Sequence, residues 1–317
     1  MVKRTNRRPG GFPTVTVDVI VTGLVILAGA AAVLLALWLA LLAPARSVRR
    51  FPRARTFSAH EPDRSDLESL FRNAFAHRGL HRRDGSVPEN ALSAFAAARD
   101  AGYGIELDLN ITRDGRVVVF HDKDLDRACG VPGRIEEKTW EELQTLRLFD
   151  SDQGIPLLED VLREIDGSVP LIVELKDTAR HRELSEAAAT LLDRYNGPYC
   201  IESFHPAIVR WFRRHRPSVI RGQLSAGPRE FSDQSPPVRL LLSSLFTNGA
   251  TRPHFVACRH QDAATSRPGA PGPRLRWRLR LFRRLGGSLV AWTVDDEVTR
   301  QWCEELFDTI IFEFIEP

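Results

Sequence analysis

The sequence predicts a (β/α)8 barrel, or TIM barrel, with a small inserted lobe and one transmembrane helix before it. Three observations support this prediction. Residues 19–42 form an uncharged apolar stretch, and short apolar runs then alternate with helical patterns from residue 71 to the end of the chain. Eight of these runs have the character of strands. The segment 71–317 matches the length of about 250 residues that is typical of such a barrel.

The apolar stretch at 19–42 consists almost wholly of Val, Leu, Ile, Ala and Gly. As a helix that rises about 1.5 Å per residue, it is long enough to cross a hydrocarbon core of about 30 Å. The apolar part of a cleavable signal peptide is shorter, about 7–15 residues. The small residues at 43–45 leave signal cleavage as the alternative, but we predict a single-pass membrane anchor.

The residues on either side of the stretch bear on its orientation. A basic N-terminal tail covers 1–18, and five arginines follow the stretch between residues 46 and 55, within a predicted juxtamembrane linker at 43–70. Because Lys and Arg nearly balance at the two ends, the positive-inside rule gives only a slight preference for a cytoplasmic catalytic domain.

The predicted barrel occupies 71–317. Its strands are expected at 75–78, 104–110, 170–176, 199–203, 219–223, 254–258, 288–293 and 309–312. Helical patterns lie between them at 90–101, 182–195, 207–214, 238–246, 275–285 and 295–307. Strands that alternate with crossover helices predict a parallel sheet. The stretch 121–168 is too long for a simple loop and has helical patterns of its own, so we predict that it forms the inserted lobe.

The composition excludes some classes of function. A net charge of +3 over 317 residues gives no whole-chain case for nucleic-acid binding. The four cysteines are scattered without a C-x-x-C pair, which favours neither a zinc site nor a disulfide scaffold.

Acidic residues recur on two predicted strands at a spacing of two. Glu106 and Asp108 lie on the strand at 104–110, and Glu174 and Lys176 lie on the strand at 170–176. Residues two apart on a strand point to the same side, and the leucine between each pair would face the helices. We therefore expect the three carboxylates to meet inside the barrel.

Carboxylates that converge in a barrel repel one another unless a cation lies among them. Ligands that are all oxygen suit a hard ion, Mg²⁺ or Ca²⁺. A set of buried carboxylate–arginine ion pairs is the alternative. It does not explain why His77 and His121 fall at the carboxyl ends of neighbouring strands, where barrel enzymes have their active sites.

His77 and His121 are candidates for general acid–base catalysis, because an imidazole titrates near neutral pH. Arg78 offers a planar fork that suits phosphate oxygens, and Lys176 offers a point charge. Two imidazoles, two cations and a hard metal ion together predict the cleavage of a phosphodiester.

Seven motifs follow one another in a characteristic order: His77-Arg78-Gly79, Pro88-Glu89-Asn90, Glu106-x-Asp108, Thr112-x-Asp114-Gly115, His121-Asp122, Leu125-x-Arg127 and Glu174-x-Lys176. With Trp292 as a late aromatic residue, this order resembles that of the glycerophosphodiester phosphodiesterase family over residues 74–312. The resemblance implies a (β/α)8 barrel, with His77 and His121 as the catalytic pair. It also implies that Ca²⁺ or Mg²⁺ is bound by Glu106, Asp108 and Glu174, and that phosphate is contacted by Arg78 and Lys176.

The other matching residues have two readings each. Glu89 and Asn90 would line the substrate-binding site, or they would begin and cap the helix after Pro88. Trp292 would close the pocket over the substrate's alcohol, or it would pack in the core. Asp122 is expected to support a neighbouring group rather than to act in catalysis.

The chain departs from the family pattern in two places. Relatives commonly end the last strand with Thr-Asp or Thr-Asn before a proline, whereas this chain has Ile311-Phe312-Glu313-Phe314-Ile315. Residues 226–266 align poorly. Both changes leave the expected metal site intact and bear on the identity of the substrate.

Six arginines between residues 274 and 284 alternate with leucine and aromatic residues. They would form a solvated outer helix face, or they would contact anionic lipid head groups. No aromatic platform accompanies them, so nucleic acid is not among the expected partners.

The predicted function is metal-dependent hydrolysis of a glycerophosphodiester to an alcohol and glycerol phosphate. One histidine would act as base and the other as acid. Action on a membrane lipid, as by a lysophospholipase D or a sphingomyelinase D, is one alternative. A catalytically silent barrel that binds lipid or phosphate is the other. The expected partners are a small phosphodiester or lysolipid and the membrane.

Overall fold

The computed structural model describes residues 17–45, 64–232, 235–265 and 274–315. Contacts between residues divide the chain into two compact units, Met1–Ala40 and Leu41–Pro317. The first unit contains the N-terminal helix α1 as far as Ala40, and the second contains the barrel. Each is described by itself.

Helix α1 (Val17–Leu42) includes the predicted apolar stretch. Its segment Val21–Leu42 has a mean hydropathy of 2.7. Most of its large apolar side chains are exposed, among them Leu27 and Leu34 at 68% and 66%. A helix that is apolar all round requires an apolar environment. The helix predicted at 19–42 is therefore present and is a candidate membrane span, while its insertion into a membrane stays a prediction.

A shortened chain tests the anchor. If the chain begins at residue 58, we expect it to be soluble, because the described residues after α1 contain no further helix that is long and apolar enough to span a bilayer. High-speed sedimentation of cell lysates would compare it with the full-length chain. Any binding through surface arginines should be released by moderate salt. A shortened chain that still requires detergent at high salt would contradict a single anchor.

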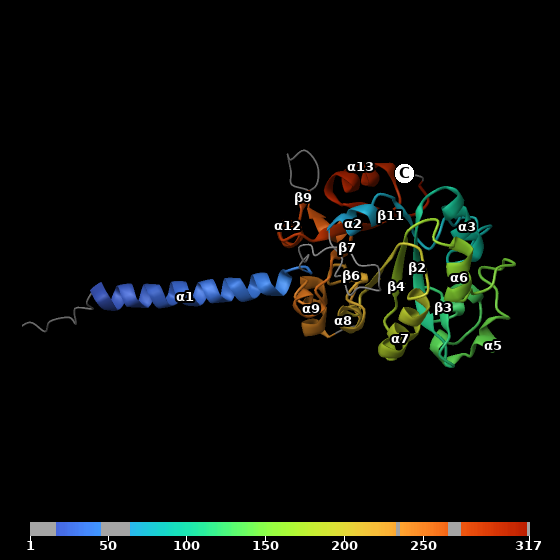
Figure 1. Ribbon diagram of the computed structural model, residues 1–317, viewed down its shortest axis with the longest axis horizontal. Helices are drawn as coiled ribbons and strands as arrows, with labels where there is room; N and C mark the ends of the chain where they lie inside the picture. The colour runs from blue at the N-terminus through green and yellow to red at the C-terminus, as the bar shows by residue number, and fades with distance from the viewer. Residues whose placement is uncertain (1–16, 46–63, 233–234, 266–273, 316–317) are drawn as a thin grey trace, which may run out of the picture. The chain divides into compact units, whose positions relative to one another are not determined.

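The eight predicted strands form a closed parallel barrel (Figure 1). Each strand pairs with the next, and β1 pairs in parallel with both β2 and β11, which closes the sheet. The strands are β1 (Phe75–Ala76), β2 (Gly104–Ile111), β4 (Leu171–Leu175), β5 (Tyr199–Ser203), β6 (Ile220–Ser225), β7 (Phe255–Arg259), β10 (Ser288–Val294) and β11 (Thr309–Phe312). The predicted fold class is confirmed.

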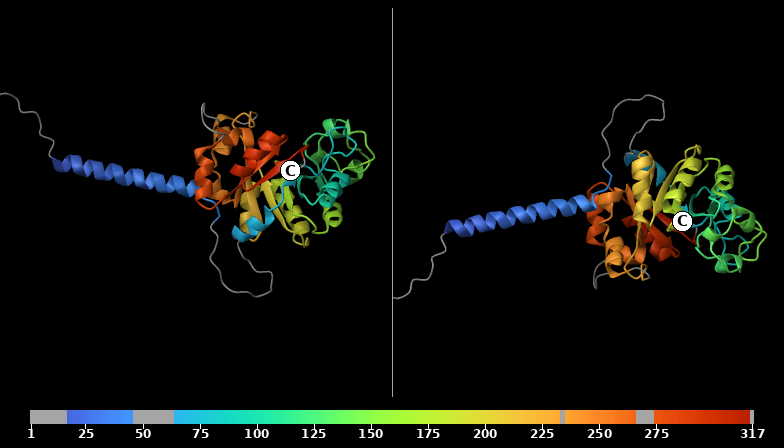
Figure 2. Two further views of the ribbon diagram at one scale, coloured as in Figure 1. Left: turned by 90° about the horizontal axis from the view of Figure 1, so that it is seen from above. Right: turned by 90° about the horizontal axis from the view of Figure 1, so that it is seen from below.

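Helices surround the barrel, as the two views in Figure 2 show. They are α3 (Leu92–Asp100), α6 (Leu158–Ile165), α7 (His181–Leu192), α8 (Pro206–His215), α9 (Pro236–Ser244), α10 (Asn248–Thr251), α12 (Trp277–Arg284) and α13 (Glu297–Leu306). The start of α8 illustrates how the sequence sets such a boundary. Pro206 occupies the first turn, where it removes no hydrogen bond, and the side chain of His205 accepts a bond from the backbone of Ala207.

Helix α2 (Arg64–Leu70) belongs to the barrel unit and not to a linker. Its Leu67 and Leu70 are buried in a cluster with Phe71, Phe75 and Phe255. The rings of Phe71 and Phe255 meet edge to face with centroids 5.2 Å apart. The linker predicted at 43–70 therefore ends before residue 64, and residues 46–63 lie outside the described residues.

The inserted lobe is smaller than predicted. Strand β3 (Val117–Val119) pairs antiparallel with β2, and the short helices α4 (Asp126–Cys129), η1 (Ile135–Glu137) and α5 (Trp140–Leu143) follow it around a separate apolar cluster. Helix α6 lies in the predicted stretch 121–168 but belongs to the barrel. It buries Leu158, Val161, Leu162 and Ile165, at the spacing of one helix face, and it contacts α3 and α7.

The region that aligns poorly with the family forms α9, α10 and a small addition after β7. The addition consists of α11 (His260–Ala263) and an antiparallel pair of β8 (Ala264–Thr265) and β9 (Arg274–Leu275). These elements follow the carboxyl ends of β6 and β7. Helix α9 and the addition therefore build one side of the barrel mouth, whereas α10 contacts α8 and precedes the amino end of β7.

Candidate functional site

The loop after β1 places Arg78 beside the second strand. Gly79 has a φ of +81°, and a Cβ there would lie 2.8 Å from the backbone of Ala94, so the turn requires glycine. The backbone N–H of Arg78 donates a hydrogen bond to Glu106 Oε2 at 3.0 Å. The His77-Arg78-Gly79 motif therefore shapes the backbone as well as supplying side chains.

Glu106 and Asp108 on β2 and Glu174 on β4 meet inside the barrel mouth. Each offers one carboxylate oxygen, and these oxygens lie within 4.8 Å of one another. All three residues are buried, at 2%, 1% and 8% exposure, and the strand register places Asp108 opposite Glu174. Burial, together with repulsion by Asp108, raises the pKa of Glu106 well above its ordinary value. A bound cation would relieve this repulsion.

Two basic side chains lie against these carboxylates. Lys176 Nζ is 2.7 Å from Asp108 Oδ1 and 2.9 Å from Glu174 Oε2. Arg78 Nε is 3.5 Å from Asp108 Oδ2. Burial alone would raise the pKa of Asp108, but the charges of Lys176 and its neighbours hold it well below its ordinary value. The ion-pair alternative therefore describes part of the site.

A fourth buried carboxylate, Glu202 on β5, lies beside the group. It is 1% exposed and stands opposite Glu174 in the strand register. Its Oε2 is buried and has no hydrogen-bond partner among the described residues. Burial and the charge of Glu174 raise its pKa well above the ordinary value. Sequence reasoning missed this residue, although its place on the strand, two after the core residue Cys200, signals that it points inward.

Glu313, the residue after β11, accepts hydrogen bonds from two histidines. Its Oε1 is 3.2 Å from His77 Nδ1 and 2.9 Å from His81 Nε2. Burial lowers the pKa of His77, and the hydrogen bond to Glu313 opposes this shift without cancelling it. The donor atoms of the three residues lie within 4.8 Å of one another, a spacing that could also hold a metal ion. The two hydrogen bonds already account for this spacing.

His121 is held by a chain of charged groups that begins in the lobe. His121 Nδ1 is 2.6 Å from Asp122 Oδ1, and Arg127 Nε is 2.6 Å from Asp122 Oδ2. Arg127 also donates to both oxygens of Glu89, and Glu89 Oε1 is 2.7 Å from Arg78 Nη1. Asp122 thus supports His121, and Glu89 supports Arg78, so neither carboxylate is directed at a substrate.

Asn90 lies in the loop after β1, and Trp292 lies on β10. Asn90 has a φ of +56° and donates from Nδ2 to Asp108 Oδ2 at 2.8 Å. Helix α3 begins after Ala91, so Asn90 is not its cap. Trp292 on β10 packs edge to face on Phe204 with centroids 5.8 Å apart. Its indole Nε1 has no hydrogen-bond partner among the described residues, which leaves a donor for a ligand.

Of the three carboxylates, Glu174 lines a cavity of about 580 Å³. The predicted site residues His121 and Lys176 also line this cavity. The other lining residues are Asp122, Lys123, Asp124, Asp126, Arg127, Asp177 and Phe204. His77 is next to Arg78, whose Nε lies 3.5 Å from Asp108 Oδ2, so it belongs to the same end of the barrel. The structure therefore brings the two histidines, the two cations and the three carboxylates to one end of the barrel.

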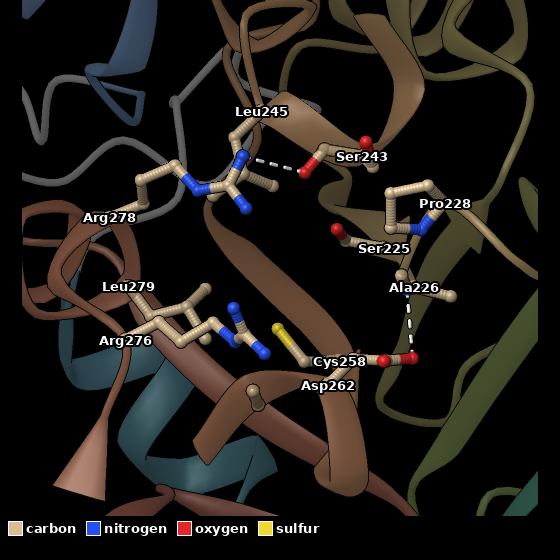
Figure 3. Close-up of a pocket in the computed structure, with 12 residues that line it drawn as sticks. Ser225, Ala226, Pro228, Ser243, Leu245, Cys258, Asp262, Arg276, Arg278 and Leu279 are labelled. Carbon is tan, nitrogen blue, oxygen red and sulfur yellow. Dashed lines mark hydrogen bonds between the residues drawn. The ribbon is translucent and has the colours of Figure 1, made fainter. Parts of the chain in front are cut away.

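A separate small cavity of about 80 Å³ lies between α9 and α12 (Figure 3). Arg278 turns toward it and donates a hydrogen bond to the backbone oxygen of Ser243 at 2.9 Å. Arg283 is bound to Asp308. The basic cluster predicted at 274–284 is thus partly engaged with its own fold, and Arg276, Arg280 and Arg284 remain on the surface.

The fold and the site define a class: closed (β/α)8 barrels with acidic, basic and imidazole groups at the carboxyl ends of the strands. A family model described as the glycerophosphoryl diester phosphodiesterase family matches residues 77–316. The chain belongs to that family, whose members are phosphoric diester hydrolases.

Curated relatives match part of the chain. A glycerophosphodiester phosphodiesterase of Bacillus altitudinis is 33% identical over 157 residues, which cover 46% of this chain and 63% of the relative. An uncharacterized protein of Bacillus subtilis (strain 168) is 36% identical over 131 residues, covering 38% and 53%. The chain thus spans less than two thirds of the length of these relatives.

Solved structures share the fold at low sequence identity. An Oleispira antarctica phosphodiesterase, solved in complex with the product sn-glycerol-3-phosphate, has a TM-score of 0.61 and 21% identity, covering 78% of this chain and 94% of that one. A glycerophosphodiester phosphodiesterase from Thermotoga maritima has a TM-score of 0.57 and 23% identity, covering 75% and 92%. At these identities the likeness concerns the barrel alone.

Proposed function

We propose that the chain hydrolyses a glycerophosphodiester to an alcohol and glycerol phosphate. One observation supports this most strongly. Three buried carboxylates, two cations and two carboxylate-bound histidines lie at the carboxyl ends of the barrel strands. Such a set can bind a phosphodiester, neutralise its charge and move two protons. The family membership and the names of the curated relatives agree with it.

The donor set fits a divalent cation. Glu106, Asp108 and Glu174 would hold Mg²⁺ or Ca²⁺, because both ions prefer oxygen ligands. Glu202, whose Oε2 has no partner among the described residues, stands next to this group. When bound, the cation would supply Lewis-acid stabilisation of charge on the phosphoryl oxygens. Arg78 and Lys176 would contact the phosphate from the other side.

We assign the base to His77 and the acid to His121. The lowered pKa of His77 keeps its imidazole neutral near pH 7, as a base must be. It would take the proton of the attacking oxygen, which belongs to water or to the neighbouring hydroxyl of the glycerol. His121, held at Nδ1 by the Asp122 carboxylate, would donate its other ring proton to the departing alkoxide. Asn90 and Glu89 would position Asp108 and Arg78, and Trp292 would contact the glycerol.

The test is turnover of glycerophosphocholine by the full-length chain in the presence of Mg²⁺ or Ca²⁺. We expect release of choline and glycerol phosphate in equal amounts. Binding of glycerol phosphate without any turnover would support a catalytically silent barrel instead.

We also propose that α1 anchors the enzyme to a membrane, with no assignment of the side.

Glu313 gives a further prediction about His77. The change Glu313→Gln removes the charge but keeps the size, so we expect kcat for glycerophosphocholine to fall about tenfold with little change in KM. In a His77→Ala background the same change should lower kcat very little, because the imidazole that Glu313 binds is already absent. Glu304→Gln, an exposed change on α13, is the matched control. Equal losses in both backgrounds would show that Glu313 does not act through His77.

A further inference from the structure

A second cavity adjoins the candidate site on the side of α9. Its volume is about 430 Å³. It shares Asp177 and Phe204 with the cavity that is lined by His121, Glu174 and Lys176. These two residues therefore stand at a common boundary. A ligand whose phosphate lies near Lys176 can extend past Phe204 into the second cavity, which is called the α9 groove below.

The α9 groove is mostly apolar. Five of its eight lining residues have apolar side chains: Phe204, Pro206, Phe231, Val238 and Leu242. Its two acidic residues have cationic partners, because Glu230 is 2.9 Å from Arg259 and Asp177 is 3.5 Å from Lys123. The eighth lining residue, His205, has its Nε2 3.7 Å from Asp177 Oδ1, and burial lowers its pKa. Since no described lysine or arginine lines the groove, it offers no fixed positive charge for a second phosphate, and its apolar lining suits a hydrocarbon.

Aromatic rings connect the groove with the candidate site. Phe204 meets Phe231 edge to face at 5.7 Å, and on its other side it meets Trp292 at 5.8 Å. Phe231 is only 7% exposed, so it is fixed in the wall of the groove. A ligand that contacts Trp292 through its glycerol would reach this aromatic wall with whatever group the glycerol carries.

Helix α9 also has apolar side chains that the barrel does not bury. Leu240 and Leu241 are 67% and 46% exposed, whereas Leu242 lines the groove. A surface helix of a soluble protein usually has polar residues on its outer face. Leu240 is therefore outside the groove lining, and it offers a matched position on the same helix for comparison with Leu242.

We propose that the α9 groove binds the acyl chain of a monoacyl glycerophosphodiester, so that the substrate class is a lysophospholipid. This inference rests on the proposed function, because the phosphate must lie at Lys176 for the acyl chain to reach the groove. A volume of about 430 Å³ suits a small ligand rather than a protein segment. The candidate span in α1 would keep the enzyme at a bilayer, where such lipids reside. The cavity in Figure 3, at about 80 Å³ and beside Arg276 and Arg278, is too small and too basic for this role.

Acyl-chain length provides the test. The full-length chain would be placed in nanodiscs of diacyl phosphatidylglycerol, which contain no choline. Choline release would be measured from glycerophosphocholine and from its acetyl, butanoyl, hexanoyl and octanoyl esters below their micelle concentrations. Each methylene that the groove buries should raise kcat/KM about fourfold, which corresponds to about 0.8 kcal/mol, until the groove is filled. A kcat/KM that does not depend on acyl length would overturn the proposal.

A variant ties the length dependence to the groove. Leu242→Gln should flatten the series, so that the ratio of kcat/KM for the octanoyl ester to that for glycerophosphocholine falls at least tenfold. This follows from the loss of two or more buried methylene contacts. Leu240→Gln makes the same change on the exposed side of the same helix and should leave the ratio as it is. If the two variants behave alike, the groove does not bind the acyl chain.

Calorimetry separates this inference from the proposed function. Octanoyl glycerol phosphate should bind more tightly than glycerol phosphate, and Leu242→Gln should remove the difference. Tighter binding without turnover of any ester would overturn the hydrolytic function and leave the groove assignment standing. Turnover of the esters without a difference in affinity between the two phosphates would overturn the groove assignment and leave the hydrolytic function standing.

Discussion

Replacing His77 or His121 with alanine is expected to lower kcat/KM for glycerophosphocholine at least about 100-fold, because general acid–base help is typically worth 10²–10⁴-fold. Each imidazole is held at Nδ1 by its own carboxylate, Glu313 or Asp122. Each therefore presents its other nitrogen for proton transfer. Steady-state release of choline by the two variants and the parent chain would measure the loss.

The identity of the leaving group should separate the two histidines. A choline alkoxide needs a proton as it departs, whereas p-nitrophenolate leaves readily without one. If His121 is the acid, His121→Ala should recover most of its rate on a p-nitrophenyl diester. His77→Ala should stay slow on both substrates, because a base is needed in each case.

Two outcomes would contradict this division of roles. Recovery of His77→Ala rather than His121→Ala would reverse the assignment of acid and base. Losses below about tenfold in both variants on glycerophosphocholine would show that the histidines are structural. His215→Ala, an exposed change at the end of α8, controls for the removal of an imidazole as such.

The fold was largely predictable because local sequence patterns indicate the strands and helices of the barrel. All eight strands appear where short apolar runs were found, and the strands at 199–203 and 309–312 have the predicted bounds. The errors concern elements whose role depends on distant contacts. Helix α2 looks like a linker until Leu67 and Leu70 meet Phe255, which is remote in the chain. Helix α6 looks like part of the lobe until it packs against α3.

The site was predictable where the spacing of residues along a strand shows to which side their side chains point. Glu106, Asp108 and Glu174 could be placed together from the alternation of their strands, and the structure brings them within 4.8 Å. Glu313 could not be placed in this way, because the chain after β11 is irregular. Its contact with His77 joins the residues that follow the first and the last strand of the barrel. The α9 groove could not be predicted either, since four of its eight lining residues come from residues 226–266, which align poorly with the family.

Removing the divalent cation is expected to abolish turnover while the barrel stays folded. The reason lies in the charge at the mouth. Four buried carboxylates lie there with Lys176 and Arg78 as close cations, and burial together with mutual repulsion raises the pKa values of Glu106 and Glu202. A cation that binds only the folded state should also raise the thermal midpoint, since at about 100 times its Kd it adds about 2.7 kcal/mol to stability. Chelation followed by addition of Mg²⁺ or Ca²⁺ would be monitored by activity and by thermal unfolding.

The substitution Asp108→Asn makes the same prediction specific to one residue. It keeps the size of the side chain and removes a charge that the cation would use, so the affinity for Mg²⁺ should fall at least about tenfold. The effect on stability should be smaller, because Glu174 still binds Lys176 and Glu89 still binds Arg78. Asp100→Asn, at the exposed end of α3, removes a charge away from the mouth and should change neither quantity. Full activity in excess chelator would show that the three carboxylates are not metal ligands.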